Sequence, residues 1–106
     1  MSISFTTSIN QREMQSKIEE IKQRFGGDVI TIRHSPGTNW MGDPAIYFRI
    51  LLADAVANNR DRLADVTGRV RWELFEELNL AELDPTSYFN FRSQSEQAEL
   101  KDPEWD

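Results

Sequence analysis

The sequence of 106 residues contains no cysteine and a single histidine. Without cysteine, the chain can form no disulfide and offers no thiolate as a nucleophile or metal ligand. His34 together with Asp28, Asp43 or Asp54 is a poor ligand set, because a soft-metal site needs more nitrogen or sulfur. We therefore expect neither a metal site nor a cofactor.

Long hydrophobic runs are also missing. The longest nearly continuous apolar segment, residues 45–53, is far shorter than the roughly 20 residues that span a bilayer. The N-terminus lacks the basic and apolar regions of a signal peptide. With 39% hydrophobic and 28% charged residues, the composition is typical of a globular protein. We expect a cytoplasmic protein with a single domain over residues 1–106.

Positive charge is scarce in the C-terminal part of the chain. The net charge is −6, and residues 61–106 carry five basic and twelve acidic side chains. A field of this sign repels nucleic acid and membrane surfaces. The charge pattern therefore favours a basic partner, if it does more than keep the protein in solution.

The segment 45–53, Ala-Ile-Tyr-Phe-Arg-Ile-Leu-Leu-Ala, is the strand around which we expect the fold to be organised. In a strand, alternate side chains point to opposite faces. One face is wholly apolar and belongs to the core: Ile46, Phe48, Ile50 and Leu52. The other is mixed: Tyr47, Arg49, Leu51 and Ala53. A mixed face is expected to be partly wet or to dock on something.

Two amphipathic helices are predicted. The first runs from Asn10 to Phe25, with Asn10 and Glu13 spaced as a capping box and Gly26-Gly27 at its end. The second runs from Arg60 to Leu78. Its expected core positions are Leu63, Val66, Val70, Leu74, Phe75 and Leu78, and Trp72 lies outside this stripe. Gly68, in its middle, costs about 1 kcal/mol relative to alanine and indicates close backbone contact or a kink.

The remaining extended pieces are shorter. Residues 28–34 form a strand joined to residues 45–53 by a ten-residue loop, His34–Asp43, with Pro36-Gly37 at its tip. Residues 88–92 form a third short strand, and residues 1–9 an edge strand or a frayed tail. Residues 93–106 are a C-terminal extension that is loosely ordered or forms helical turns after Ser93, which is spaced as a capping box with Glu96.

These elements predict an α+β fold of two layers. The order is α-β-β-α with a short third strand and a C-terminal extension, and two helices cover a small antiparallel sheet. Two strands alone do not make a stable sheet. The missing strand must therefore come from residues 88–92, from the N-terminal segment or from a second copy of the chain.

No catalytic motif stands out. Gly37 and Gly42 have the spacing of a phosphate-binding loop, but Asp43-Pro44 follows where lysine and a hydroxyl are required. Adjacent residues on a strand point apart, so His34 and Ser35 cannot form a base–nucleophile pair. An enzyme would require a buried polar cluster around His34 and Asp43, which makes it the weakest alternative.

Aromatic residues supply the best functional candidates. Five of them lie outside the predicted apolar stripes: Trp40, Tyr47, Trp72, Tyr88 and Trp105. Exposed aromatics are typical interface anchors, although Tyr47, Trp72 and Tyr88 could equally complete the core of a small sheet. We expect a non-enzymatic protein–protein interaction module that binds a protein partner or forms a homodimer.

An RNA-associated domain is the main alternative. The α-β-β-α order is similar to that of KH-type RNA-binding modules, and the second helix carries Arg60, Arg62, Arg69 and Arg71. The Gly-x-x-Gly loop of those modules is missing, and a pI near 4.7 is far from a basic footprint.

Three stretches carry a family resemblance: Trp40-Met-Gly-Asp-Pro-Ala45, Arg69-Val-Arg-Trp-Glu-Leu-Phe75 and Tyr88-Phe-Asn-Phe-Arg-Ser-Gln-Ser-Glu-Gln97. Over residues 28–105 the chain resembles small bacterial α+β proteins of unassigned activity, some of them encoded beside helical proteins of the HEPN class. The resemblance implies a pairing in which an acidic, antitoxin-like protein restrains a helical, ribonuclease-like toxin.

Overall fold

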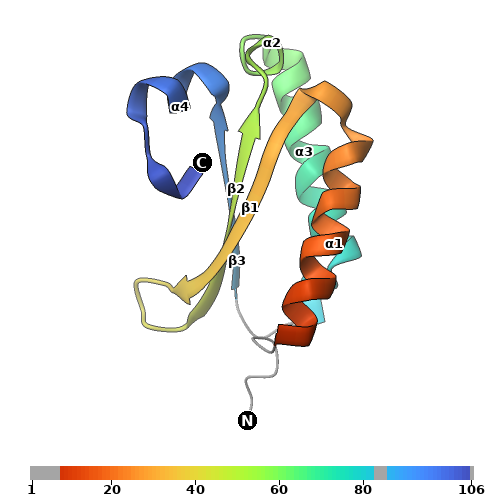
Figure 1. Ribbon diagram of the computed structural model, residues 1–106, viewed down its shortest axis with the longest axis vertical. Coiled ribbons are helices and arrows are strands. Elements are labelled where there is room, and N and C mark those ends of the chain that lie inside the picture. The colour runs from red at the N-terminus through yellow and green to blue at the C-terminus, as the bar shows by residue number, and fades with distance from the viewer. Residues whose placement is uncertain (1–7, 83–85, 106) are drawn as a thin grey trace.

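The computed structural model describes residues 8–82 and 86–105. Most of the segment 1–9, expected to be extended, lies outside these residues, and its last two residues begin a helix. The elements are α1 (Ser8–Arg24), β1 (Val29–Thr38), β2 (Pro44–Leu52), α2 (Asp54–Ala57), α3 (Arg60–Glu77), β3 (Thr86–Ser93) and α4 (Gln94–Leu100), with short 3₁₀ turns at Gly26–Asp28, Leu80–Glu82 and Pro103–Trp105. Their arrangement confirms the predicted α+β class (Figure 1). Within the described residues, no helix combines the length and the apolar character needed to cross a membrane.

The sheet has three strands in the order β1-β2-β3, and β3 supplies the third strand from within the chain. The strand β1 pairs with β2 in antiparallel fashion, as predicted. The prediction of an antiparallel sheet is wrong for β3, which pairs with β2 in parallel. The reason is the connection: α2 and α3 carry the chain back along the sheet, so β3 starts from the same end as β2.

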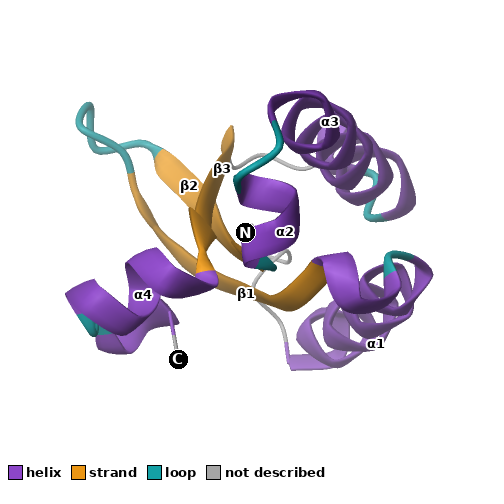
Figure 2. Ribbon diagram, turned by 90° about the horizontal axis from the view of Figure 1, so that it is seen from above, coloured by secondary structure: helices purple, strands orange, loops and turns teal. Residues whose placement is uncertain are grey.

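The core lies between the sheet and the two long helices, α1 and α3, which cover the same face (Figure 2). The apolar face of β2 is buried as predicted, with Ile46, Phe48, Ile50 and Leu52 at most 1% exposed. They pack with Ile18 and Ile21 of α1 and with Val66, Val70 and Leu74 of α3. Since each such side chain contributes about 1.5–3 kcal/mol on burial, this face of β2 is the centre of the fold.

The β1–β2 hairpin is longer than predicted. The strands continue through Thr38 and from Pro44, so the expected loop His34–Asp43 shrinks to a turn over residues 39–43. The Pro36-Gly37 pair lies within β1 and not at the tip, because proline is tolerated on an edge strand. Asn39 makes the turn instead, since its side-chain Oδ1 accepts hydrogen bonds from the backbone N–H groups of Met41 and Asp43 at 2.9 and 3.0 Å.

The structure confirms most of what the sequence pattern predicts for the two long helices. Helix α3 begins at Arg60 as predicted, and α1 ends one residue before Phe25. The start of α1 at Ser8 places Asn10 inside the helix, so the predicted capping box at Asn10 is wrong. The prediction of Phe75 as a core residue is also wrong, because Phe75 is 40% exposed.

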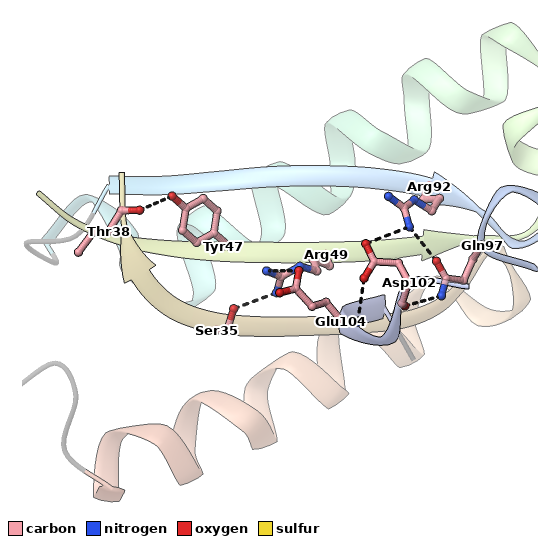
Figure 3. A network of polar contacts seen from close by, with 8 residues as sticks. All are labelled: Ser35, Thr38, Tyr47, Arg49, Arg92, Gln97, Asp102 and Glu104. Atoms are coloured by element: carbon pink, nitrogen blue, oxygen red, sulfur yellow. Dashed lines mark hydrogen bonds and ion pairs between the residues drawn. The ribbon is translucent and has the colours of Figure 1, made fainter. Parts of the chain in front are cut away.

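The second face of the sheet is partly covered by the C-terminal segment, residues 93–105 (Figure 2). Helix α4 begins with the predicted capping box between Ser93 and Glu96. Beyond it, Trp105 is buried and packs on the Arg92 guanidinium, 4.3 Å from the ring centroid. Glu104 forms an ion pair with Arg49 at 3.3 Å (Figure 3). The mixed face of β2 therefore docks on the chain's own C-terminal segment.

Candidate partner-binding surface

The five aromatic candidates lie in separate places. Trp105 is only 6% exposed beneath the C-terminal segment, so it is not a surface anchor in this structure. Tyr47 and Tyr88 lie side by side on the second face of the sheet. Trp40 lies in the hairpin turn, and Trp72 lies on α3, the helix that covers the first face. The structure therefore does not gather the five residues into one site.

The Tyr47–Tyr88 pair completes its face of the sheet. The two rings are stacked with their centroids 5.2 Å apart. The Tyr47 hydroxyl donates to the Thr38 carbonyl at 2.6 Å (Figure 3), and the Tyr88 hydroxyl accepts from the Asn39 Nδ2 at 3.4 Å. Both rings are half-buried and both hydroxyls have partners. The two rings therefore support each other on this face of the sheet while each keeps part of its surface exposed.

Trp40 is the most exposed large apolar residue, at 88%, and its neighbour Met41 is 60% exposed. The turn that carries them is held by the two hydrogen bonds to Asn39. The Trp40 ring makes no ring or cation contact with the rest of the described chain. Trp40 is thus a highly exposed aromatic side chain in the hairpin turn, and it is not part of a larger apolar surface.

Trp72 belongs to a larger apolar surface, which we call the α3–β3 groove. It is a hollow of about 300 Å³ lined by Gly68, Arg71, Trp72 and Phe75 of α3 and by Phe89 of β3. Trp72 is 63% exposed and Phe75 is 40% exposed. The groove therefore presents two large apolar side chains to solvent from one helix face.

The Phe89 side of the groove is anchored in the core. The Phe89 ring stacks on Phe48 of β2 with centroids 5.3 Å apart. The Arg71 guanidinium lies 5.5 Å from the centroid of Phe91, the next β3 residue on the same face. This contact directs a charged side chain along the strand beside the groove. The result is an apolar floor with a cation at its rim, which is a common composition for an interface core.

Of the groove residues, only Trp72 is predicted from the sequence to bind protein. The sequence pattern assigns Phe75 to the core and Arg71 to the RNA-binding alternative, and it gives no role to Phe89. The signal was present, because Ala64, Gly68, Trp72 and Phe75 recur at i, i+4, i+8 and i+11, a second stripe on α3. Neither predicted explanation of Gly68 is supported within the chain. Gly68 lies inside an uninterrupted helix, and a Cβ added there would meet no atom within 4 Å.

The strand beside the groove has an unprotected edge. In the part of the chain that the structure describes, no strand pairs with the outer side of β3. The opposite edge, β1, contains Pro36 and an irregularity in register between Val29 and Thr31, two features that discourage further pairing. The strand β3 contains no proline or lysine. Its one charged residue, Arg92, is engaged with Gln97 and Asp102 on the second face.

The four arginines of the RNA-binding alternative do not share one surface. Arg62 forms an ion pair with Asp28 at 2.6 Å. Arg69 pairs with Asp65 at 3.5 Å and lies over the Phe25 ring, whereas Arg71 lies over Phe91. The helical spacing places Arg60 and Arg71 on one side of α3 and the other two on the opposite side. This arrangement forms no continuous basic patch.

The residues considered for catalysis also lie apart. His34 is half-buried against Phe48, and burial lowers the pKa of its imidazole below the usual range. Ser35 points to the other face, where its hydroxyl accepts a hydrogen bond from Arg49 at 2.8 Å. Asp43 is exposed in the hairpin turn, so it forms no buried polar cluster with His34. Among the described residues, no three histidine, cysteine or acidic side chains are grouped to hold a metal ion.

Comparison with known proteins gave no match to a protein-family model, to a curated protein or to a solved structure. On the described surface, the α3–β3 groove is where two large apolar side chains, Trp72 and Phe75, lie exposed beside a hollow.

Proposed function

We propose that the protein is a non-enzymatic, cytoplasmic interaction module that binds another protein chain through the α3–β3 groove. The observation that carries the proposal is the exposure of Trp72 and Phe75 beside the unprotected edge of β3. Tryptophan in such a position is among the residues that contribute most to binding energy. An open strand edge offers a row of backbone donors and acceptors to a partner.

The biological role that the family resemblance implies is regulatory, with the protein restraining a helical partner in an antitoxin-like manner. The distribution of charge modifies this idea. Many acidic side chains of the C-terminal half pair with arginines of the same chain: Glu73 and Glu77 with Arg24, Glu104 with Arg49, and Asp102 with Arg92. The apolar groove, more than the net charge, supports the proposed contact.

The test compares two exposed tryptophans at different places. Tagged wild-type protein and the variants Trp72→Ala and Trp40→Ala are purified from the native host after ribonuclease treatment. Because both side chains are largely exposed, both variants are expected to fold, with changes in stability near 0.5 kcal/mol. We expect a stoichiometric protein partner, another protein or an untagged copy, with the wild type and with Trp40→Ala. Trp72→Ala should weaken its binding by about 2 kcal/mol, roughly 30-fold.

Equal capture by Trp72→Ala, with an unchanged circular dichroism spectrum, would show that the groove is not the contact surface. Loss of the partner only in Trp40→Ala would move the contact to the hairpin turn. Nucleic acid that is retained without ribonuclease and lost with it would favour the RNA-associated alternative.

A further inference from the structure

We infer that the second face of the sheet is a binding site for an acidic peptide segment that carries a tryptophan. In this structure the chain's own C-terminal segment occupies the site. The site is separate from the α3–β3 groove, so the inference goes beyond the proposed function. The partner is a protein with an exposed acidic and aromatic segment, which binds by displacing residues 101–105 of this chain.

The chemistry of the site is defined by the groups that occupy it. Asp102 pairs with Arg92 of β3 at 3.7 Å (Figure 3). Glu104 pairs with Arg49 of the neighbouring strand β2 at 3.3 Å. Trp105 packs on the Arg92 guanidinium, 4.3 Å from the ring centroid. Two guanidinium groups thus hold two carboxylates and one aromatic ring, the two kinds of group that arginine binds best.

The contacts that hold the C-terminal segment can be exchanged for those of a ligand. The side chain of Glu104 is 68% exposed, and Trp105 is the only buried residue in the range 101–105. Exposed ion pairs contribute little to stability. The attachment of the segment to the chain helps to keep it in place, because a short tether gives a local concentration on the order of millimolar. A ligand with the same groups and further contacts can therefore replace it.

A further cation lies on the same face. Arg33 of β1 is opposite Arg49 in register, so the two side chains lie on the same face of the sheet. Arg33 is exposed and forms no ion pair with any other residue that the structure describes. Like charges opposite each other in a sheet repel, and an additional acidic group of a ligand offsets this repulsion. Charges more than about 8 Å away are largely screened at physiological ionic strength, so these local cations outweigh the net negative charge of the chain.

The first test measures the binding of a labelled probe peptide with the sequence of residues 101–105, Lys-Asp-Pro-Glu-Trp, whose ends are acetylated and amidated. In the full chain, Trp105→Ala removes the ring of the C-terminal segment and leaves both arginines in place. Fluorescence anisotropy should show that this variant binds the probe. The wild type should bind it about 10-fold more weakly, because affinity falls with the fraction of open molecules, about one in ten.

Leu100→Ala is the matched control. It shortens an exposed apolar side chain of the same segment outside the site, so it should bind the probe like the wild type. Equal affinity of the wild type and Trp105→Ala for the probe would overturn the inference. Absence of binding to Trp105→Ala at about 1 mM probe would also overturn it.

Two further substitutions in the Trp105→Ala chain locate the bound probe. Arg49→Glu should abolish binding, and binding that survives this change would show that the probe lies elsewhere and overturn the inference. A probe extended by two glutamates should bind about 3-fold more tightly than one extended by two glutamines. Arg33→Gln should remove this difference, and a difference that persists would exclude Arg33 from the site.

A second measurement keeps the native C-terminal segment. The chain with Trp40→Phe and Trp72→Phe has Trp105 as its only tryptophan. Its fluorescence should shift to longer wavelength when the peptide Lys-Asp-Pro-Glu-Phe, at roughly 10 mM, displaces the buried ring. The same peptide with lysine in place of both acidic residues should cause no shift. Equal spectra with and without the acidic peptide would overturn the inference, and a shift caused only by single-stranded RNA would overturn it in favour of phosphate binding.

This site and the α3–β3 groove are tested independently. Trp72 lies on α3, which covers the opposite face of the sheet (Figure 2). Adding Trp72→Ala to the Trp105→Ala chain should therefore leave the affinity for the probe unchanged. Loss of probe binding in that double variant would contradict the separation of the two surfaces and overturn the inference, whereas the proposed function fails only if Trp72→Ala captures the partner as the wild type does.

Discussion

At the scale of single residues, His34 is the side chain most affected by its surroundings. It lies on the helix-covered face of β1, with its ring centroid 6.2 Å from that of Phe48. Burial disfavours the charged imidazolium and lowers the pKa of His34 below its usual value of 6.5. In the folded protein the ring is therefore neutral at pH 7 and resists protonation as the pH falls.

This lowered pKa predicts that the free energy of unfolding decreases as the pH falls below 6.5. In that window the unfolded chain binds a proton at His34 before the folded chain does, so protonation favours unfolding. The loss ends once the pH drops below the folded-state pKa. The measurement is urea denaturation at several pH values between 7 and 5, with His34→Phe as the control because phenylalanine fills the site without titrating.

His34→Phe should show a flatter pH dependence over the same range. The carboxyl groups whose pKa is lowered, Asp54 by its hydrogen bonds from Ser95 and Glu77 by its hydrogen bond from Arg24, affect stability only at lower pH. The ordinary pKa values of these groups are 3.8 and 4.5, so their effect is separated from that of His34. Identical slopes in the wild type and the variant would contradict the prediction.

At the scale of elements, the sequence pattern was informative wherever one periodicity dominated. The alternation in 45–53 and the apolar stripes of the two long helices located β2, α1 and α3 to within a few residues. The direction of β3 was missed because the prediction used the alternation of side chains, which identifies faces and carries no information on strand polarity. The predicted helix between the two strands was the available signal, since a helical crossover joins parallel strands. The Pro36-Gly37 pair misled the prediction of the hairpin tip, since the same residues also suit an edge strand.

The α3–β3 groove was predictable only in part, because α3 carries apolar residues on two sides and the prediction did not separate them. The two stripes of α3 lie on opposite sides of one helix, and both contain apolar residues. Phe75 was assigned to the core because it is adjacent to Leu74, although the helical turn of 100° per residue moves it toward the Gly68 side. Trp105 lies outside every stripe, yet it is buried, because the C-terminal segment that contains it packs on the sheet through contacts with Arg49 and Arg92.

Gly68 links the stability of α3 to its contact surface and gives the prediction at this scale. Gly68→Ala should raise the free energy of unfolding of the monomer by about 1 kcal/mol, because alanine has the higher helix propensity and its Cβ meets no atom of the chain. The same methyl group should occupy part of the α3–β3 groove, which Gly68 lines, and weaken binding of the protein partner. Urea denaturation measures the first effect, and capture of the partner by the tagged protein measures the second.

Ser16→Ala on the exposed face of α1 is the control, since it also improves helix propensity but lies on the other long helix. It should stabilise the protein slightly and leave partner binding unchanged. If Gly68→Ala binds the partner as strongly as the wild type, the open space at Gly68 is not needed for binding.

At the scale of the whole molecule, folding pairs part of the acidic C-terminal half with arginines of the same chain. Arg24 of α1 binds Glu73 and Glu77 of α3, and these contacts raise the pKa of its guanidinium. A second set of ion pairs lies on the other face of the sheet, where Arg49 and Arg92 contact acidic side chains of the C-terminal segment (Figure 3). Exposed ion pairs contribute only about 0–1 kcal/mol each. Their main consequence is that several acidic side chains of the C-terminal half contact their own chain, so the charge of this half alone does not define a partner.

If the partner bound at the α3–β3 groove is a second copy of this chain, the proposed function makes a final prediction for the stability of the whole molecule. If folding and dimerisation are coupled, the wild-type Tm should rise with protein concentration, because association favours the folded state by mass action. For two chains of this size, a tenfold increase in concentration should raise the Tm by about 3 °C. Trp72→Ala should show a constant Tm over the same range, because it removes the most exposed apolar side chain of the groove, and Trp40→Ala should keep the dependence. A wild-type Tm that does not change between about 5 and 500 μM, a range around the micromolar Kd of ordinary dimers, would show that each chain folds without its copy.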